Sequence, residues 1–180
     1  MAEQQGHLLR RAALAAALSA AALTATSLPA TASSTNSALA AARAATAAFH
    51  DPAAAQAAGY LRTEDCVAVP GLGVMGQHWI NPRYFGSVDP AHPQALLYVP
   101  TNDGPRLVAV EYIVPTNEPV AANPGQVDPN GPELFGQHLN GVLAGHVRNT
   151  PNHWDLHVWI WAHNPAGVFS QFNPAPALSC

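Results

Sequence analysis

The sequence predicts an α+β fold in which short N-terminal helices pack on an antiparallel sheet or a small open barrel. Two observations lead to this prediction. Residues 38–59 are rich in alanine, the residue with the highest helix propensity. From Tyr60 onward, short apolar runs are bounded by Pro, Gly and Asn, which is typical of strands joined by turns. No internal repeat is visible, so one globular domain is expected over residues 38–180.

The first 32 residues have the order of a cleavable signal peptide. Arg10 and Arg11 form the positive end, an apolar run rich in Ala and Leu follows, and Ala30-Thr31-Ala32 suits a signal peptidase. We therefore expect cleavage after Ala32 and a secreted or periplasmic protein without membrane insertion of the mature chain. The arginine pair also leaves twin-arginine export open, although Leu9 stands where Ser or Thr usually precedes the pair.

The expected helices follow a flexible leader over residues 33–37. Helix is predicted from Ala38, and Asp51-Pro52 restarts it, with Asp51 as N-cap and Pro52 at the first helical position. Gly59 then provides a C-terminal stop. The alternative is that the alanine tract is only a disordered extension, because few large apolar residues anchor it.

The expected strands are apolar runs separated by turn residues. They cover residues 66–69, 95–99, 107–114 and 156–161. Residues 116–132 are rich in Pro, Asn and Gly and are predicted to form a long surface loop.

Charge and cysteine content limit the partners and the compartment. The chain has 7 arginines and lysines against 11 acidic residues, a net charge of −4. Nucleic acids and anionic membranes require basic surfaces, so a small molecule or a metal ion is the expected partner. Cys66 and Cys180 are the only cysteines, and an exported chain with two cysteines usually joins them. A redox pair or two thiolate metal ligands are the alternatives.

The segment at residues 153–164, HWDLHVWIWAHN, is the richest in chemistry. In an extended chain alternate side chains share a face, so a polar and aromatic row would oppose an apolar one. Such a face suits a pocket, for which Tyr112, Trp159 and Trp161 are the candidate walls. His153 and His157 also have the helical spacing of zinc proteases, but Trp154 occupies the position of the required glutamate. The polar and aromatic row of the extended segment comprises His153, Asp155, His157, Trp159, Trp161 and His163.

Glu111 is the only charge in the apolar run 107–114. Because burying an unpaired carboxylate is costly, Glu111 should lie at an edge, pair with a cation or bind a metal. Arg83 and Arg148 are the candidate arginine partners.

The segment GLGVMGQH at residues 71–78 contains G-x-G-x-x-G. A dinucleotide site is not expected, because Pro70 precedes the motif and Asn81-Pro82 follows it where a helix is required. The glycines are instead predicted to form a tight loop that presents His78. His138 likewise follows a Gly-Gln pair.

Together these residues predict a zinc, copper, iron or manganese site with nitrogen and oxygen ligands. The apparatus for nucleophilic catalysis is missing, since there is no G-x-S-x-G elbow and both cysteines are expected to be oxidised. The sequence therefore assigns neither a catalytic residue nor a reaction. The candidate ligands are His78, Glu111, His157, His163 and His138.

The chain also resembles an uncharacterised family of small exported bacterial proteins over nearly its whole mature part. This resemblance implies export but no particular activity. The shared pattern comprises Phe49-His50-Asp51, Ala58-Gly59-Tyr60, Cys66, Gly73-Val74-Met75-Gly76-Gln77-His78, Leu96-Leu97-Tyr98, Val110-Glu111-Tyr112, Pro132-Glu133-Leu134-Phe135-Gly136, Leu156-His157-Val158-Trp159, Asn164-Pro165-Ala166-Gly167-Val168-Phe169 and Cys180.

The function expected from the sequence is therefore that of a secreted or periplasmic metal-binding domain. One alternative is a metal-free module that binds a small molecule in an aromatic pocket. Another is a structural or interaction protein of the cell envelope.

Overall fold

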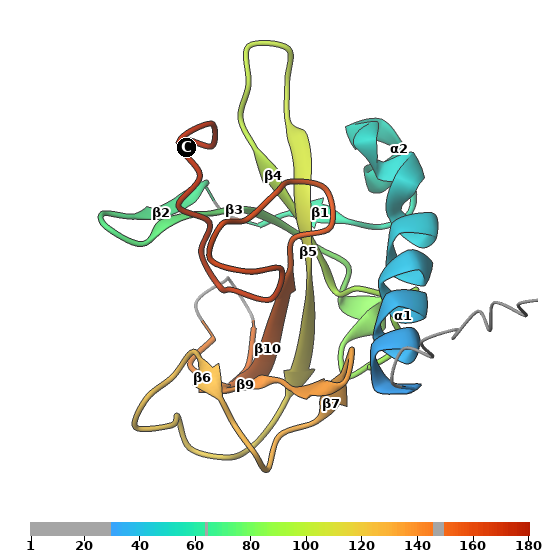
Figure 1. Ribbon diagram of the computed structural model, residues 1–180. Helices are drawn as coiled ribbons and strands as arrows, with labels where there is room; N and C mark the ends of the chain where they lie inside the picture. The colour runs from blue at the N-terminus through green and yellow to red at the C-terminus, as the bar shows by residue number, and fades with distance from the viewer. Residues whose placement is uncertain (1–29, 64, 146–149) are drawn as a thin grey trace, which may run out of the picture.

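A computed structural model describes residues 30–63, 65–145 and 150–180. Within this part, N-terminal helices lie beside an antiparallel sheet in the order β1-β3-β4-β5-β10-β9-β6, with β2 paired to β3 (Figure 1). Strands β1 and β6 end the order, so this sheet is not closed into a barrel. The predicted α+β class is confirmed. The predicted signal peptide lies outside the described residues except for its last three, which begin helix α1.

The helical region runs through α1 (Ala30–Thr46), η1 (Ala47–His50) and α2 (Pro52–Ala57). Asp51 caps α2 by accepting a hydrogen bond from the amide of Ala53, and Gly59 has the positive φ, 98°, of a helix stop. Both features agree with the sequence. Residues 33–37, which were expected to form a flexible leader, lie within α1. Thr35 ties this part of α1 to the rest of the fold through a hydrogen bond from Oγ1 to the carbonyl of Phe135. Among the described residues, no helix is long and apolar enough to cross a membrane.

Three of the four predicted strands agree closely with the structure. β10 covers His153–Val158 instead of 156–161, and β3 lies where a glycine loop was expected. Strands β1, β7, β8 and β9 were not predicted. The 116–132 segment contains only the two-residue strand β6. The strands are β1 (Leu61–Arg62), β2 (Val67–Val69), β3 (Gly73–Ile80), β4 (Ala95–Val99), β5 (Arg106–Pro115), β6 (Gln126–Val127), β7 (Glu133–Leu134), β8 (Gln137–His138), β9 (Asn140–Leu143) and β10 (His153–Val158); β7 and β8 form a separate hairpin, and η2 (Pro82–Tyr84) follows β3.

The two faces of the sheet are covered by different parts of the chain. One face packs against α1, and its buried side chains include Tyr98, Tyr112 and Leu156. On the other face, Leu97 and Ala109 pack against residues from the C-terminal segment 159–180, which loops back over the strands (Figure 1). Both faces of the central strands are therefore buried, as their almost uninterrupted apolar sequences require.

A disulfide bond between Cys66 and Cys180 joins the C-terminal segment to the chain just before β2. This confirms the predicted pairing. Within the loop of chain that this disulfide closes, the backbones of Asn173 and Val74 exchange two hydrogen bonds. These bonds attach the C-terminal segment to β3. The segment is thus held against the sheet at two separate points.

Candidate metal centre

Three buried side chains from three strands meet on the sheet face that the C-terminal segment covers. His78 of β3, Glu111 of β5 and His157 of β10 each offer one ligand atom, and these atoms lie within 4.8 Å of one another. The Nε2 atom of His78 is 3.3 Å from Oε2 of Glu111, and the Nε2 atom of His157 is 3.8 Å from Oε1 of the same carboxylate. None of the three side chains is more than 1% exposed.

The strand register explains why these residues meet. Glu111 pairs directly with His157 of the neighbouring strand β10, so their side chains leave the sheet on the same face. His78 lies one strand farther away, on the far side of β4. Its side chain reaches Glu111 because Ala95, the β4 residue opposite Glu111, presents only a methyl group. The small side chain of Ala95 therefore leaves room for a histidine to cross above β4.

Asp155 extends the group along β10. Its Oδ2 atom lies 3.2 Å from Nδ1 of His157, and both side chains are fully buried. In a neutral imidazole, a carboxylate beside Nδ1 favours the proton on that nitrogen, and Nε2 with its lone pair is then the atom that faces Glu111. Metal-bound histidines commonly have such a carboxylate on the nitrogen remote from the ion. Asp155 was placed on this face by sequence alternation, but its role beside His157 was missed.

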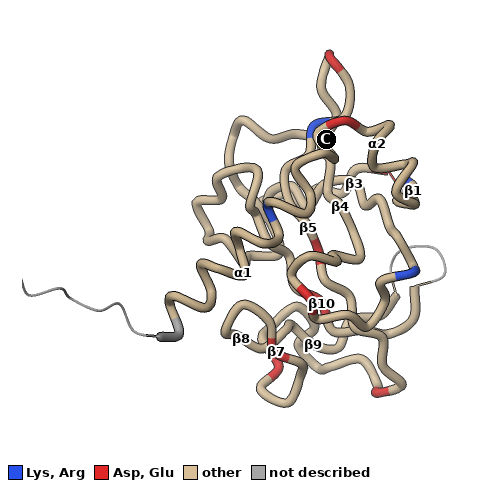
Figure 2. The backbone as a smooth tube through the Cα atoms, turned by 90° about the vertical axis from the view of Figure 1, so that its right-hand side faces the viewer, with Lys and Arg blue, Asp and Glu red and all other residues tan. Residues whose placement is uncertain are grey.

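The electrostatics favour the charged forms of Asp155 and His157 despite burial. Burial raises the pKa of Asp155, but contacts with His157, His153 and Asn140 outweigh it and leave the pKa below its usual value. Burial lowers the pKa of His157, yet the carboxylates of Glu111 and Asp155 raise it more. Two acidic residues therefore lie inside the sheet, on β5 and β10 (Figure 2). Their negative charge creates a demand for a cation, either an imidazolium or a metal ion.

The other two candidate ligands lie elsewhere. His138 of β8 is partly exposed, with Nδ1 2.8 Å from the carbonyl oxygen of Gly131 and Nε2 3.1 Å from Oε1 of Glu133. His163 is exposed in the C-terminal segment. The structure therefore does not bring either residue to the buried group. Glu111 contacts histidines and not Arg83, and the alternative partner Arg148 lies outside the described residues.

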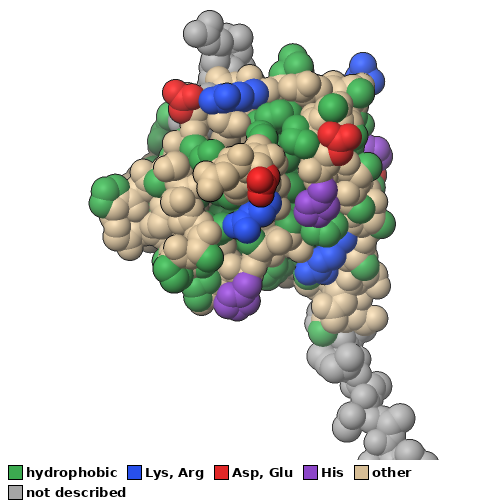
Figure 3. All heavy atoms as spheres, turned by 90° about the horizontal axis from the view of Figure 1, so that it is seen from above, with side chains coloured by type: hydrophobic (Ala, Val, Ile, Leu, Met, Phe, Trp, Pro, Cys, Tyr) green, Lys and Arg blue, Asp and Glu red, His purple; other side chains and the backbone are tan. Residues whose placement is uncertain are grey.

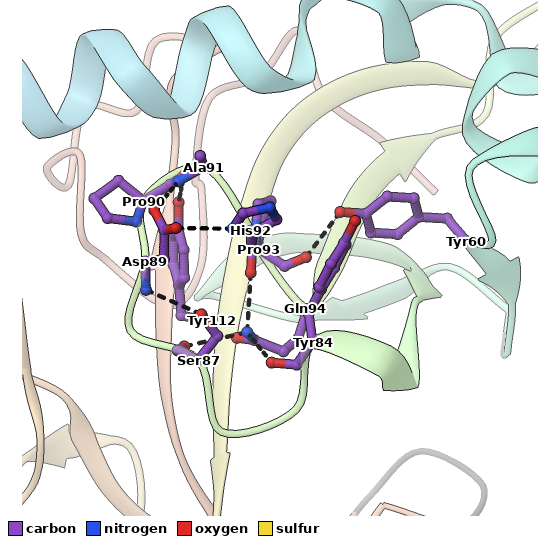
Figure 4. A network of polar contacts seen from close by, with 10 residues as sticks. All are labelled: Tyr60, Tyr84, Ser87, Asp89, Pro90, Ala91, His92, Pro93, Gln94 and Tyr112. Carbon is purple, nitrogen blue, oxygen red and sulfur yellow. Dashed lines mark hydrogen bonds and ion pairs between the residues drawn. The ribbon is translucent and has the colours of Figure 1, made fainter.

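Of the three aromatic residues expected to line a pocket, Trp159 and Trp161 border one surface hollow, and Tyr112 lies apart from them. Tyr112 is buried on the α1 face, and its hydroxyl donates to the carbonyl of Pro90 (Figure 4). Trp159 is buried on the opposite face, where Nε1 donates to the carbonyl of Ser170. Trp161 was expected on the face of His157, but the chain leaves β10 after Val158 and turns the indole toward α1, where it donates to Thr46.

Comparisons with known proteins add no relative to these observations. No family model, curated protein or solved structure matches this chain. The arguments about function therefore start from the geometry of the buried group.

Proposed function

We propose that this protein is an exported domain that binds one divalent transition metal ion through His78, Glu111 and His157. The observation that supports the proposal is the meeting of three ligand atoms within 4.8 Å in a fully buried position. Two imidazole nitrogens and one carboxylate oxygen form a ligand set suited to zinc, and also to copper, iron or manganese. Asp155 would orient His157 from the side remote from the ion.

Charge balance adds a second argument. Glu111 and Asp155 are both almost completely inaccessible to solvent, and within the described part of the chain their ion-pair partners are histidines. A bound dication would compensate both carboxylates and let the histidines remain neutral. Without metal, the same compensation requires protonated histidines inside the sheet, where burial opposes their charge.

The burial also indicates what the ion would do. Catalytic zinc sites have three protein ligands and an open position for water or substrate. Here the three ligand side chains are at most 1% exposed and belong to three strands of one sheet. This arrangement favours an ion that fastens β3, β5 and β10 together over one that acts on a substrate. The disulfide supports placement of the domain in an oxidising compartment.

The proposal is tested by metal content and by metal-dependent stability. Protein secreted by its producing cell should contain about one equivalent of a transition metal when measured by mass spectrometry. Glu111→Gln and His157→Gln should lose that metal, whereas His92→Gln should keep it, because His92 is exposed and pairs with Asp89. In the wild type, the ion should raise the free energy of unfolding by about 2.7 kcal/mol at a concentration 100 times Kd, since it binds only the folded state.

Two results would contradict the proposal. One is a folded wild type that takes up no zinc, copper, iron or manganese at micromolar concentration. The other is a pair of folded variants that bind as tightly as the wild type. The first result would leave the buried group as a metal-free network of carboxylates and protonated histidines. Circular dichroism of each variant establishes that it is folded before its metal content is compared.

A further inference from the structure

Two adjoining hollows open on the surface around Trp161, away from the buried metal ligands. One has a volume of about 470 Å³ and is bordered by Arg43 of α1. The other has a volume of about 360 Å³ and is bordered by Arg106 at the start of β5. Both are also lined by Trp161, Ala162 and His163, and we call the combined surface the Trp161 groove. Its size is within the range of small-molecule sites.

The charge of the Trp161 groove is opposite to that of the whole chain. The chain carries a net charge of −4 and contains no lysine, yet two of its arginines border this one surface. None of the residues that line either hollow is acidic. Figure 3 shows arginine and histidine side chains on the upper face of the molecule, with hydrophobic and acidic side chains among them. An excess of positive charge at a hollow favours an anionic ligand.

Both arginines have donors available for such a ligand. Arg43 is exposed and donates from Nε to the carbonyl of Ile160, a contact that fixes the guanidinium at the rim while leaving its terminal nitrogens for other partners. Arg106 is exposed as well. Within the described part of the chain neither makes an ion pair, in contrast to Arg62, which pairs with Asp65. A guanidinium binds a carboxylate through two parallel hydrogen bonds.

Trp161 provides a fixed aromatic surface that both hollows share. Its Nε1 atom donates to Oγ1 of Thr46 at 3.1 Å, and the ring of His50 contacts it edge-on with centroids 4.4 Å apart. The indole is half-buried, and Ile160 and Val168 add apolar surface to the same hollow. A fixed indole with apolar neighbours suits the flat ring of a ligand.

We propose that the Trp161 groove binds a small organic anion composed of an aromatic ring and a carboxylate. The ring lies against Trp161, and the carboxylate accepts hydrogen bonds from Arg43 or Arg106. This site is independent of the proposed metal ion, because none of its lining residues belongs to the buried group of His78, Glu111 and His157.

The test compares two probes of nearly equal shape, phenylacetate and the neutral phenylacetamide, by nuclear magnetic resonance titration of the full chain. Phenylacetate should bind at least about tenfold more tightly, because only it has the charge that a guanidinium recognises. Arg43→Gln and Arg106→Gln should together weaken phenylacetate binding by about tenfold or more. Arg83→Gln is the matched control, since Arg83 is an exposed arginine outside both hollows.

Four outcomes would overturn the proposal. Three are equal affinity for the two probes, an equal loss in the Arg83→Gln control, and saturation shifts that map away from Trp161 and His163. Failure of phenylacetate to bind at 10 mM also counts against it, with millimolar affinity being the weakest expected of a specific small ligand. Because all substituted arginines are exposed, loss of folding is not the expected cause of any difference.

Discussion

Asp155 shows how one side chain can determine the chemistry of another. Its carboxylate lies 3.2 Å from Nδ1 of His157, and in the neutral imidazole this contact favours the tautomer with the proton on Nδ1 and the lone pair on Nε2. Glu111 lies on the Nε2 side. If a metal ion binds between Glu111 and His157, Asp155 is therefore a positioning residue that also makes the imidazole a stronger ligand.

We accordingly expect Asp155→Asn to weaken metal binding by about 10- to 100-fold, the usual effect of changing such an outer partner. The amide retains the shape and an acceptor oxygen but lacks the charge. Affinity can be measured by competition with a chromophoric zinc chelator. Asp89→Asn is the control, because Asp89 is a half-exposed carboxylate that contacts only His92 among the described histidines. Equal zinc affinities for the two variants would contradict a positioning role for Asp155.

The candidate site was partly predictable from single residues. Glu111 stood out as the one charge in an apolar run, and alternation placed His157 and Asp155 on one face. His138 and His163 entered the predicted ligand set because chain spacing does not reveal which histidines converge in space. The crossing of His78 above β4 depends on the strand order and on the small size of Ala95, and neither follows from the local sequence.

At the scale of elements, β3 was predicted as a loop because of its glycines. Gly73 and Gly76 do have positive φ values, 108° and 107°, but they lie within a strand. The reason is close approach: a Cβ atom at Gly73 would collide with the backbone of Asn173 and Pro174 in the C-terminal segment. A glycine in a strand can thus mark contact with another backbone as well as a turn.

Gly73→Ala should therefore destabilise the protein by about 1–3 kcal/mol, combining unfavourable φ with a backbone collision. Gly71→Ala provides a matched comparison, since Gly71 also has positive φ, 82°, but a Cβ there would meet no atom within 4 Å. Denaturant unfolding followed by circular dichroism gives both free energies. The expectation fails if the two variants lose the same stability, because the collision would then contribute nothing.

Three buried tyrosines connect the helices and the segment after η2 to the sheet. The hydroxyl of Tyr60 donates to the carbonyl of Pro93, and Tyr112 donates to that of Pro90 (Figure 4). Tyr98 donates to the carbonyl of Phe49 in η1. Burial raises the pKa of each of these phenols, with smaller contributions from neighbouring groups. Each hydroxyl is thus held in its neutral, donating form.

The free energy of unfolding should therefore decrease as the pH rises above about 10. A phenol whose pKa is higher in the folded protein than in the unfolded chain stabilises the fold fully below about pH 10, and this contribution is lost as the pH rises further. Of the 4 tyrosines, Tyr60, Tyr98 and Tyr112 should ionise only together with unfolding. Absorbance at 295 nm and circular dichroism, recorded on the same samples, test this. Ionisation of all tyrosines near pH 10 with an unchanged spectrum of the backbone would contradict it.

At the scale of the whole molecule, the sequence predicted the fold class and the disulfide because both depend on general patterns. Helix propensity, N-capping at Asp51 and the Pro, Gly and Asn residues of turns depend only on neighbouring residues in the sequence. The two cysteines allow only one intramolecular pairing. The packing of residues 159–180 over one face of the sheet was not predictable in this way. It depends on contacts between distant segments, such as those of Trp159 and Leu178 with Leu97 and Ala109.

That packing links the disulfide to the proposed metal site. Leu97 of β4 pairs with His78 of β3 on one side and Ala109 of β5 on the other, so the cluster that Leu178 covers is adjacent to the proposed metal ligands on the same face. The Cys66–Cys180 bond closes a loop with a sequence separation of 114 residues, and the loss of such a bond typically costs about 2–5 kcal/mol. Opening the bond should loosen the segment and expose the face beneath it.

The variant Cys66→Ala/Cys180→Ala should consequently have a lower free energy of unfolding by about 2–5 kcal/mol. After zinc loading, it should also release the ion to an excess of chelator several-fold faster than the oxidised wild type, because local opening of the segment becomes more frequent. Wild type treated with a reductant that does not bind zinc should approach the rate of the variant. Equal release rates for all three samples, with the expected loss of stability, would show that the segment does not control access to the ion.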